Sequence, residues 1–208
     1  MKSSSVDILG RMDYDTSHQI QLDEKRRVLK GQSPGTLFIL EHDPPVITLG
    51  RRAVRDNILF DDDLIQKKGY QVRRVGRGGD VTVHEPGQAV CYFVLPVRSK
   101  SAVSFVEGIV DVVRGFLEEE YGLPCGYDRN FPGLWVRGRK ICSIGFDLTG
   151  GVSLHGIALN VCNTLEGFGM IRPCGMGDVT MTTLSRERGA EVPVEEVFSG
   201  LAARYGDF

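Results

Sequence analysis

A cysteine in an unusual setting is the first candidate for chemistry in this sequence. Cys174 stands between Pro173 and Gly175 in the stretch MIRPCGMG, residues 170–177, which has neither a helical nor a strand period. Proline removes a backbone donor and glycine frees the backbone, so this is a turn and poor core material. The thiol is therefore a candidate nucleophile, although a loop cysteine without a role fits these residues as well.

A glycine-rich segment is the second candidate. In RRVGRGGDVTVHEPGQ, residues 73–88, three glycines allow close approach of a ligand and four polar side chains supply donors: Gly76, Gly78, Gly79, Arg77, Thr82, His84 and Gln88. The spacing is not that of a phosphate-binding GxxxxGK[ST] loop, and the segment does not open a helix. A binding loop and a glycine hairpin loop with solvated arginines both remain open.

Two further segments contain residues that packing alone does not require. Lys140 begins a strand of small and apolar residues, and the pair His155-Gly156 interrupts the apolar strand VSLHGIALNV. A lysine near a thiol lowers its pKa from about 8.5 and can act as its base. A lysine at the start of a strand is, taken alone, usually solvated. Gly156 weakens its strand unless another group approaches its backbone.

The elements that must position these residues alternate between strands and helices. We predict helices over 15–32, 61–69, 101–122 and 192–208, and strands over 6–14, 36–43, 46–52, 70–75, 89–97 and 152–161. Asp15 or Thr16 is expected to cap the first helix and Ser101 the third. A hairpin over 133–150 is expected to turn at Arg137-Gly138. These elements predict one domain over residues 1–208, of the α/β (α+β) class, with a mixed β-sheet flanked by helices.

Composition narrows the function classes. The 208 residues are 41% hydrophobic and carry a net charge of -2, which argues against nucleic acid as the main partner. No apolar run approaches the roughly 18 residues that cross a bilayer, and no secretion signal opens the chain, so we expect a cytoplasmic protein without a membrane partner. Five cysteines without a CxxC pair and four scattered histidines indicate reduced thiols and no metal site.

The chain resembles the lipoyl(octanoyl) transferase family. The motifs EHDPPVITLGRR, GRGGDVTVHEPGQAVCY, RKICSIG, HGIALNV and IRPCG occur in the family's order over about residues 40–182. The resemblance implies the fold of biotin and lipoate protein ligases. It also implies that Cys174 takes an octanoyl group as a thioester, and that Lys140 lowers the pKa of this thiol and serves as its base.

The resemblance also implies which segments line the acyl and substrate site. They are Arg77, Gly78, Gly79, Asp80, Val81, Thr82, Val83 and His84, then Ser143, Ile144 and Gly145, and then Gly156, Ile157 and Ala158. His155 is a candidate for a supporting role. No cofactor is implied beyond the 4'-phosphopantetheine that the acyl donor carries on acyl carrier protein. The implied acceptors are the lipoyl domains of 2-oxoacid dehydrogenase acyltransferase subunits and the glycine-cleavage H protein.

Two other functions remain as alternatives. One is an ATP-dependent lipoate or biotin ligase on the same fold, against which Cys174 and Lys140 argue because a ligase needs no nucleophilic cysteine. The other is a non-catalytic module that binds acyl chains or lipoyl domains, which would have no use for this pair. The sequence does not choose the oxyanion donors among the backbone N–H groups near Gly78, Gly79 and Gly175.

The chain departs from the family at two positions. Val83 stands where an aromatic residue is usual and Cys142 where alanine is common, so the preferred acyl length is left open. In a regular strand Lys140 and Cys142 project from the same face, about 6.6 Å apart along it. Cys142 is then either a resolving thiol behind Cys174 or a small apolar filler. A basic docking rim for an acidic carrier protein is expected from Arg51, Arg52, Arg73, Arg74 and Arg77.

Overall fold

The computed structural model describes residues 4–97, 101–172, 179–204 and 206. Its strands are β1 (Ser5–Met12), β2 (Thr36–His42), β3 (Val46–Leu49), β4 (Gln71–Arg74), β5 (Val81–His84), β6 (Gln88–Val94), β7 (Gly126–Asp128), β8 (Gly133–Val136), β9 (Arg139–Asp147) and β10 (Leu154–Asn160). Its α-helices are α1 (Tyr14–Leu29), α2 (Asp62–Lys67), α3 (Ala102–Tyr121), α4 (Leu184–Arg188) and α5 (Val194–Ala203). Cys174 and its two neighbours lie outside the described residues.

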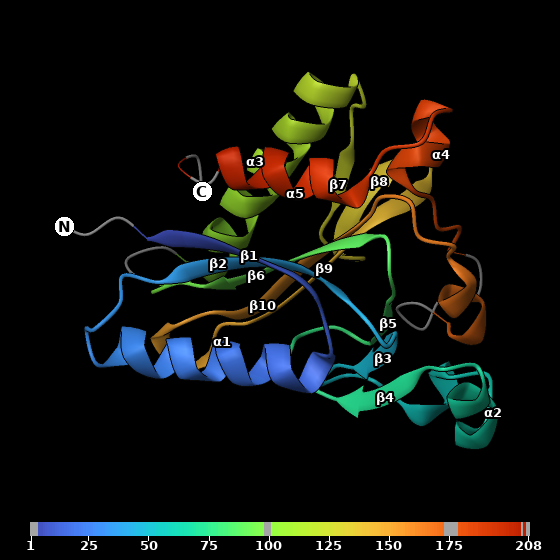
Figure 1. Ribbon diagram of the computed structural model, residues 1–208, viewed down its shortest axis with the longest axis horizontal. Coiled ribbons are helices and arrows are strands. Elements are labelled where there is room, and N and C mark those ends of the chain that lie inside the picture. The colour runs from blue at the N-terminus through green and yellow to red at the C-terminus, as the bar shows by residue number, and fades with distance from the viewer. Residues whose placement is uncertain (1–3, 98–100, 173–178, 205, 207–208) are drawn as a thin grey trace.

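Seven strands form one mixed sheet in the order β1-β2-β6-β10-β9-β8-β7. Strand β1 pairs with β2 in parallel, and the other pairs are antiparallel. Helices α3 and α5 lie over one face of this sheet and α1 over the other (Figure 1). Strands β2 and β6 are buried at every position, because both faces of the sheet are covered. The predicted mixed sheet with flanking helices is confirmed.

A second, smaller sheet has the order β4-β3-β5 and lies beside α2 (Figure 1). Its outer strand β5 falls inside the glycine-rich segment, where we expected only a loop. That expectation was wrong because the VTVH stretch is too short to show a clear period, yet it pairs with β3 from Thr48 opposite Thr82 to Val46 opposite His84. The ordered strand brings the polar residues of this segment under the main sheet.

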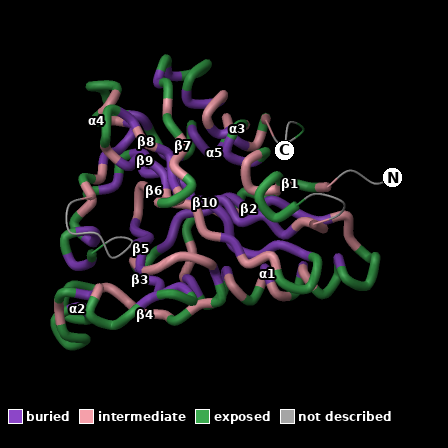
Figure 2. The backbone as a smooth tube through the Cα atoms, turned by 180° about the vertical axis from the view of Figure 1, so that it is seen from behind, coloured by how far each residue is buried: buried purple, intermediate pink, exposed green. Residues whose placement is uncertain are grey.

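Hydrophobic side chains form three clusters around these layers. The largest lies between the main sheet and helices α3 and α5, another lies between the sheet and α1, and the third fills the small sheet and α2. Buried residues concentrate in the central strands of the main sheet, whereas most residues of α2 are exposed (Figure 2). Among the described residues, no helix is both long and apolar enough to span a bilayer.

Local signals predicted several element boundaries. Ser101 caps α3 by accepting from the Ser104 N–H at 3.1 Å, and α3 ends at Gly122 with φ of 60°. The hairpin β8–β9 turns at Arg137 and Gly138, both with positive φ. The cap of α1 was predicted wrongly. It is Asp13, which accepts from the Thr16 N–H, while Asp15 lies in the first turn and binds Arg73.

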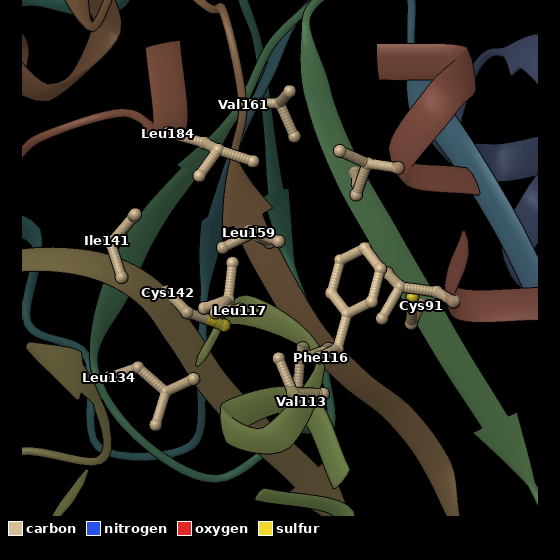
Figure 3. Close-up of a cluster of buried hydrophobic side chains, with 14 of the residues drawn as sticks. Cys91, Val113, Phe116, Leu117, Leu134, Ile141, Cys142, Leu159, Val161 and Leu184 are labelled. Carbon is tan, nitrogen blue, oxygen red and sulfur yellow. The ribbon is translucent and has the colours of Figure 1, made fainter. Parts of the chain in front are cut away.

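Strand β9 contains a β-bulge that decides which way its side chains point. Leu134 and Trp135 are consecutive on β8, but they pair with Cys142 and Lys140, so Ile141 is the extra residue. Ile141 and Cys142 both enter the large cluster, next to Leu134 and Leu117 (Figure 3). The expectation that Lys140 and Cys142 share a face was therefore wrong. Cys142 is an apolar filler, fully buried, and burial raises the pKa of its thiol to about 12.

Candidate active site

A cavity of about 360 Å³ lies between the main sheet and the small sheet. Its walls come from β3, β5, β6, β9 and β10, from the start of α1, and from the loops that follow β3 and precede β5 and β8. It is lined by Lys140 and by most of the residues that the family resemblance implied: Arg77, Gly79, Asp80, Val81, Thr82, His84, Ser143, Ile144, Gly145, His155, Gly156, Ile157 and Ala158. Three segments far apart in sequence, 77–84, 140–145 and 155–158, thus meet around one space.

Two of the implied residues do not line this cavity. Gly78 lines a neighbouring cavity of about 340 Å³, which shares Gly79 and Gly145 with the first. Val83 packs fully buried in the cluster under the small sheet, because alternation along β5 turns it away from Thr82 and His84. The substitution of an aromatic residue by Val83 therefore changes the core of the small sheet and not the cavity wall.

The sequence reasoning gave no site role to seven further lining residues: Tyr14, Thr48, Val75, Tyr92, Asn130, Phe131 and Pro132. Arg52, which was expected in the docking rim, also lines the cavity. Tyr14, expected at the end of the first strand, opens α1, and Tyr92, the last residue of the GRGGDVTVHEPGQAVCY motif, lies in the middle of β6. The FPG stretch before β8 could have been noticed as a turn, but nothing in it indicates a cavity wall.

Arg77 holds the glycine-rich loop in place from the inside. Only 7% of its surface is exposed, and its guanidinium donates to the Thr48 backbone oxygen at 2.6 Å and to Thr48 Oγ1 at 2.8 Å. Gly145 leaves room for the arginine stem, since a Cβ there would lie 3.1 Å from Arg77 Cδ. Arg77 is thus an anchor between β3 and the loop, and it does not belong to an exposed docking rim.

The remaining arginines of the expected rim differ in their partners. Arg51 forms an ion pair with Asp147 at 3.0 Å, and Arg73 forms one with Asp15 at 2.8 Å. Arg52 and Arg74 are exposed and make no ion pair within the described part of the chain, and Arg52 lines both cavities. Of the five arginines, Arg52 is therefore the one that is exposed, makes no ion pair with the described residues and lines both cavities.

A buried carboxylate ties the glycine-rich segment to the chain that leads toward Cys174. Glu85 is 3% exposed and accepts from Tyr70 Oη, from Asn163 Nδ2 and from the N–H groups of Leu165 and Gly167, at 2.7–3.2 Å. Four donors compensate for burying this charge. Glu85 was not among the predicted residues, although it directly follows His84 in the motif.

Lys140 is buried to 98% of its surface, contrary to the solvated lysine that its place at a strand start suggests. Its Nζ lies 5.6 Å from the centroid of the Trp135 ring. Its backbone N–H donates to the Thr180 oxygen and its oxygen accepts from the Thr182 N–H, each at 2.9 Å. The chain that leaves the Cys174 segment is thereby paired directly with Lys140.

The chain that enters the Cys174 segment is held as well. The Arg172 N–H donates to the Asn57 oxygen at 2.8 Å, and Ile171 forms a bridge with Ile58. Asn57 Nδ2 in turn donates to Asp80 Oδ2 in the glycine-rich loop at 2.5 Å. Residues on both sides of 173–178 are therefore bonded to parts of the cavity wall.

All four histidines of the chain gather beside the cavity, although they are scattered in sequence. Five rings form a closed circuit with centroids 5.5–6.2 Å apart: Tyr14, His18, His155, Tyr92 and His42. His84 packs against His42 from outside this circuit at 5.5 Å. We call these six residues the histidine–tyrosine cluster. It forms part of the wall through Tyr14, His84, Tyr92 and His155.

Burial keeps the imidazoles of this cluster neutral at pH 7. It lowers the pKa of His42 to about 4 and that of His155 to about 3, with His18 lowering the latter further, and it holds the pKa of His84 well below its usual range. The Tyr92 O–H donates to His42 Nε2 at 2.7 Å, since His42 Nδ1 donates to the Met12 oxygen. Tyr14 Oη and His155 Nε2 are buried without a hydrogen-bond partner among the described residues.

Glycine at 156 is explained by a neighbouring strand. A Cβ there would overlap the Cys91 oxygen of β6 and lie 2.9 Å from Phe93 Cδ2. This is the close backbone approach that the HG pair suggested. His155 itself has φ of 60°, an unusual conformation for a residue with a side chain. The two residues thus form a local irregularity at the edge of the cavity.

Comparisons with known proteins identify the family. A family model described as the lipoyl protein ligase A/B catalytic domain matches residues 14–205. An octanoyltransferase of Alkaliphilus metalliredigens (strain QYMF) is 39% identical, over 88% of this chain and 85% of its own length. The chain belongs to the octanoyltransferase family. It is accordingly an acyltransferase related to protein lipoylation, and the resemblance found in its motifs is confirmed.

Solved structures share the fold. A putative lipoate protein ligase from T. acidophilum with bound lipoic acid superposes with a TM-score of 0.77 at 18% identity, over 99% of this chain and 86% of that one. Biotin protein ligase from Aquifex aeolicus gives a TM-score of 0.53 at 16% identity, over 96% of this chain and 66% of its own. The predicted biotin/lipoate protein ligase-like fold is confirmed.

Proposed function

We propose that this octanoyltransferase moves an octanoyl group from octanoyl-acyl carrier protein to a lysine of a lipoyl domain, through a thioester on Cys174. Family membership supports octanoyl transfer in general. The proposal adds the donor, the intermediate and the acceptor. Lys140 and Cys174 act as a dyad, and the cavity beside Lys140 receives the acyl chain.

The observation that carries the proposal is the backbone pairing of Lys140 with Thr180 and Thr182. Thr180 follows Cys174 by six residues, a stretch of chain that spans at most about 22 Å. The Lys140 side chain is buried and lines the cavity. An amine in the wall of a cavity can meet a thiol and an acyl donor that enter this space, which supports a catalytic role.

In the first half-reaction, the proton of the Cys174 thiol passes to Lys140 Nζ and the thiolate attacks the thioester carbonyl of the donor. The new C–S bond forms as the carbonyl oxygen takes up negative charge. The donor's C–S bond then breaks, and Lys140 returns the proton to the departing phosphopantetheine sulfur. No ATP is consumed, since the thioester donor is already activated.

In the second half-reaction, the amine of the acceptor lysine attacks the Cys174 thioester. A C–N bond forms, the C–S bond of the enzyme breaks, and the amine proton is accepted through Lys140. The Gly79 N–H is the candidate oxyanion donor that remains among the described residues, because Gly79 lines the cavity and its N–H makes no hydrogen bond within the described part of the chain. The Gly78 N–H is already engaged by the Phe146 oxygen at 2.8 Å.

The test is intact-mass analysis after incubation with octanoyl-acyl carrier protein. We expect one octanoyl adduct on Cys174 that hydroxylamine removes and that a lipoyl domain accepts. The matched control is Cys162→Ala, which removes an exposed thiol in another part of the molecule. An adduct that persists unchanged in Cys174→Ala would refute the thioester intermediate.

The ligase alternative is tested in the same assay, because solved relatives of this fold include lipoate and biotin ligases. Free octanoate with ATP replaces the carrier-bound donor. We expect no acylation of the lipoyl domain under these conditions and full acylation from octanoyl-acyl carrier protein without ATP. The opposite pattern would identify a ligase.

A further inference from the structure

We infer that Gly133 is a positioning residue for Lys140, because the place of a side chain at position 133 is taken by the lysine itself. The inference rests on the proposed function of Lys140 and extends it to a residue on the neighbouring strand. Gly133 begins β8, directly after the Asn130–Pro132 loop that lines the cavity.

The space beside Gly133 is filled by two groups of β9. A Cβ built on Gly133 would overlap Lys140 Cε, would lie 2.6 Å from the Cys142 oxygen, and would lie 3.1 Å from Lys140 Nζ. Gly133 has a negative φ, so backbone conformation is not what requires glycine here. The requirement is space, first for the lysine stem and also for the Cys142 oxygen.

The β-bulge explains why the lysine needs this path. Without the extra Ile141, Lys140 would share a face with Cys142 and enter the apolar cluster. The bulge turns Lys140 to the side of Ser143, which pairs with Gly133 and lines the cavity. The lysine stem therefore crosses β8 at Gly133 on its way to the cavity, and a methyl group there would block it.

The Gly133→Ala variant should consequently displace the amine without removing it. A misplacement on the ångström scale costs about 10²-fold in rate, so we expect kcat/KM for octanoyl transfer at pH 7 to fall by about that factor. The pH profile should move toward higher pH, in the direction of Lys140→Ala, since a displaced amine stabilises the thiolate less. A purely structural defect would lower activity at all pH values alike.

The experiment is a double-mutant cycle with Gly133→Ala, Lys140→Ala and both changes together. In the Lys140→Ala background the Cε atom is absent, so adding Gly133→Ala should change kcat/KM less than threefold. Gly126→Ala is the matched control on strand β7, because its Cβ would meet only the Trp135 oxygen at 3.9 Å. It should leave the pH profile unchanged.

The outcomes distinguish a failure of the role proposed for Lys140 from a failure of the role inferred for Gly133. If Lys140→Ala keeps the parent activity and pH profile, the proposed function of Lys140 is wrong. If Lys140→Ala is impaired but Gly133→Ala matches the parent profile, or if the two losses multiply in the double variant, Gly133 does not act through Lys140 and the inference is overturned.

A thermal-denaturation measurement keeps the test decisive if Gly133→Ala is too unstable to assay. Part of the steric conflict involves Lys140 Cε and part involves the Cys142 oxygen. The double variant removes the first part, so its melting temperature should lie above that of Gly133→Ala. A double variant less stable than Gly133→Ala would contradict the inference.

Discussion

The two sides of the cavity bury polar side chains by different means. On the Lys140 side, the backbone pairs with Thr180 and Thr182 and the side chain passes over Gly133. On the opposite side, the histidine–tyrosine cluster packs ring against ring, and burial holds its imidazoles in the neutral form. The comparison teaches that buried polar groups can be held in two ways: a cation by backbone pairing and a fitted channel, as the proposed role of Lys140 requires, and neutral imidazoles by ring packing.

The largest expected effect concerns the Lys140 side. Lys140→Ala should slow octanoyl transfer by about 10²- to 10⁴-fold, the range for loss of a general base. Raising the pH should restore part of the rate, because the thiolate of Cys174 then forms without help. The measurement is the pH–rate profile of iodoacetamide labelling at Cys174.

Lys25→Ala provides the control for removal of a lysine. Lys25 is half-buried on α1, its Nζ donates to the Thr149 oxygen at 2.9 Å, and neither residue lines the cavity. The pH–rate profile of iodoacetamide labelling in Lys25→Ala should equal that of the parent. A Lys140→Ala profile that also equals the parent would remove the distinction between the two sides of the cavity.

The next effect is the loss of folding stability at acid pH that the buried His155 of the histidine–tyrosine cluster causes. The folded-state pKa of His155 is lowered to about 3, against about 6.5 in the unfolded chain. The contribution of His155 to the free energy of unfolding is therefore fully present above pH 6.5 and is lost as the pH falls toward 3. Near pH 5 the unfolded chain binds about one proton more at this site, which corresponds to about 1.4 kcal/mol per pH unit.

His155→Asn is the variant that isolates this contribution, since asparagine tolerates the positive φ at this position. Urea denaturation of the parent and the variant between pH 4.5 and 7.5 should give curves that converge as the pH falls, with the slope of the variant smaller by about 1.4 kcal/mol per pH unit. Parallel curves would show that His155 is not buried as a neutral group.

The smallest effect compares two tyrosines within the cluster. Tyr92→Phe should lower the free energy of unfolding by about 1–3 kcal/mol, since it leaves His42 Nε2 buried without a donor. Tyr14→Phe should leave it unchanged or raise it, because Tyr14 Oη is buried without a partner among the described residues and its removal relieves the cost of burying an unpaired hydroxyl. Urea denaturation at pH 7.5 measures both. Equal losses would contradict the assigned hydrogen bonds.

Sequence patterns predicted the elements whose signals are local. Helix α3 shows its apolar stripe and its Ser101 cap, and the β8–β9 hairpin shows its turn at Arg137-Gly138. The motifs also predicted most of the cavity wall, because they follow the family's order along the chain. These features need only neighbouring residues or a known pattern to be recognised.

The tertiary structure alone decided the direction of Lys140, the gathering of the histidines and the close packing of Lys140 against Gly133. A single extra residue in β9 reverses which face the preceding side chains occupy, and this register depends on hydrogen bonds with β8 that no period-2 pattern records. The histidines meet because β2, β5, β10 and α1 pack together, at separations that the sequence does not encode locally. The sequence by itself determined which groups are available for chemistry, and the packing of distant strands determined which of them face the cavity.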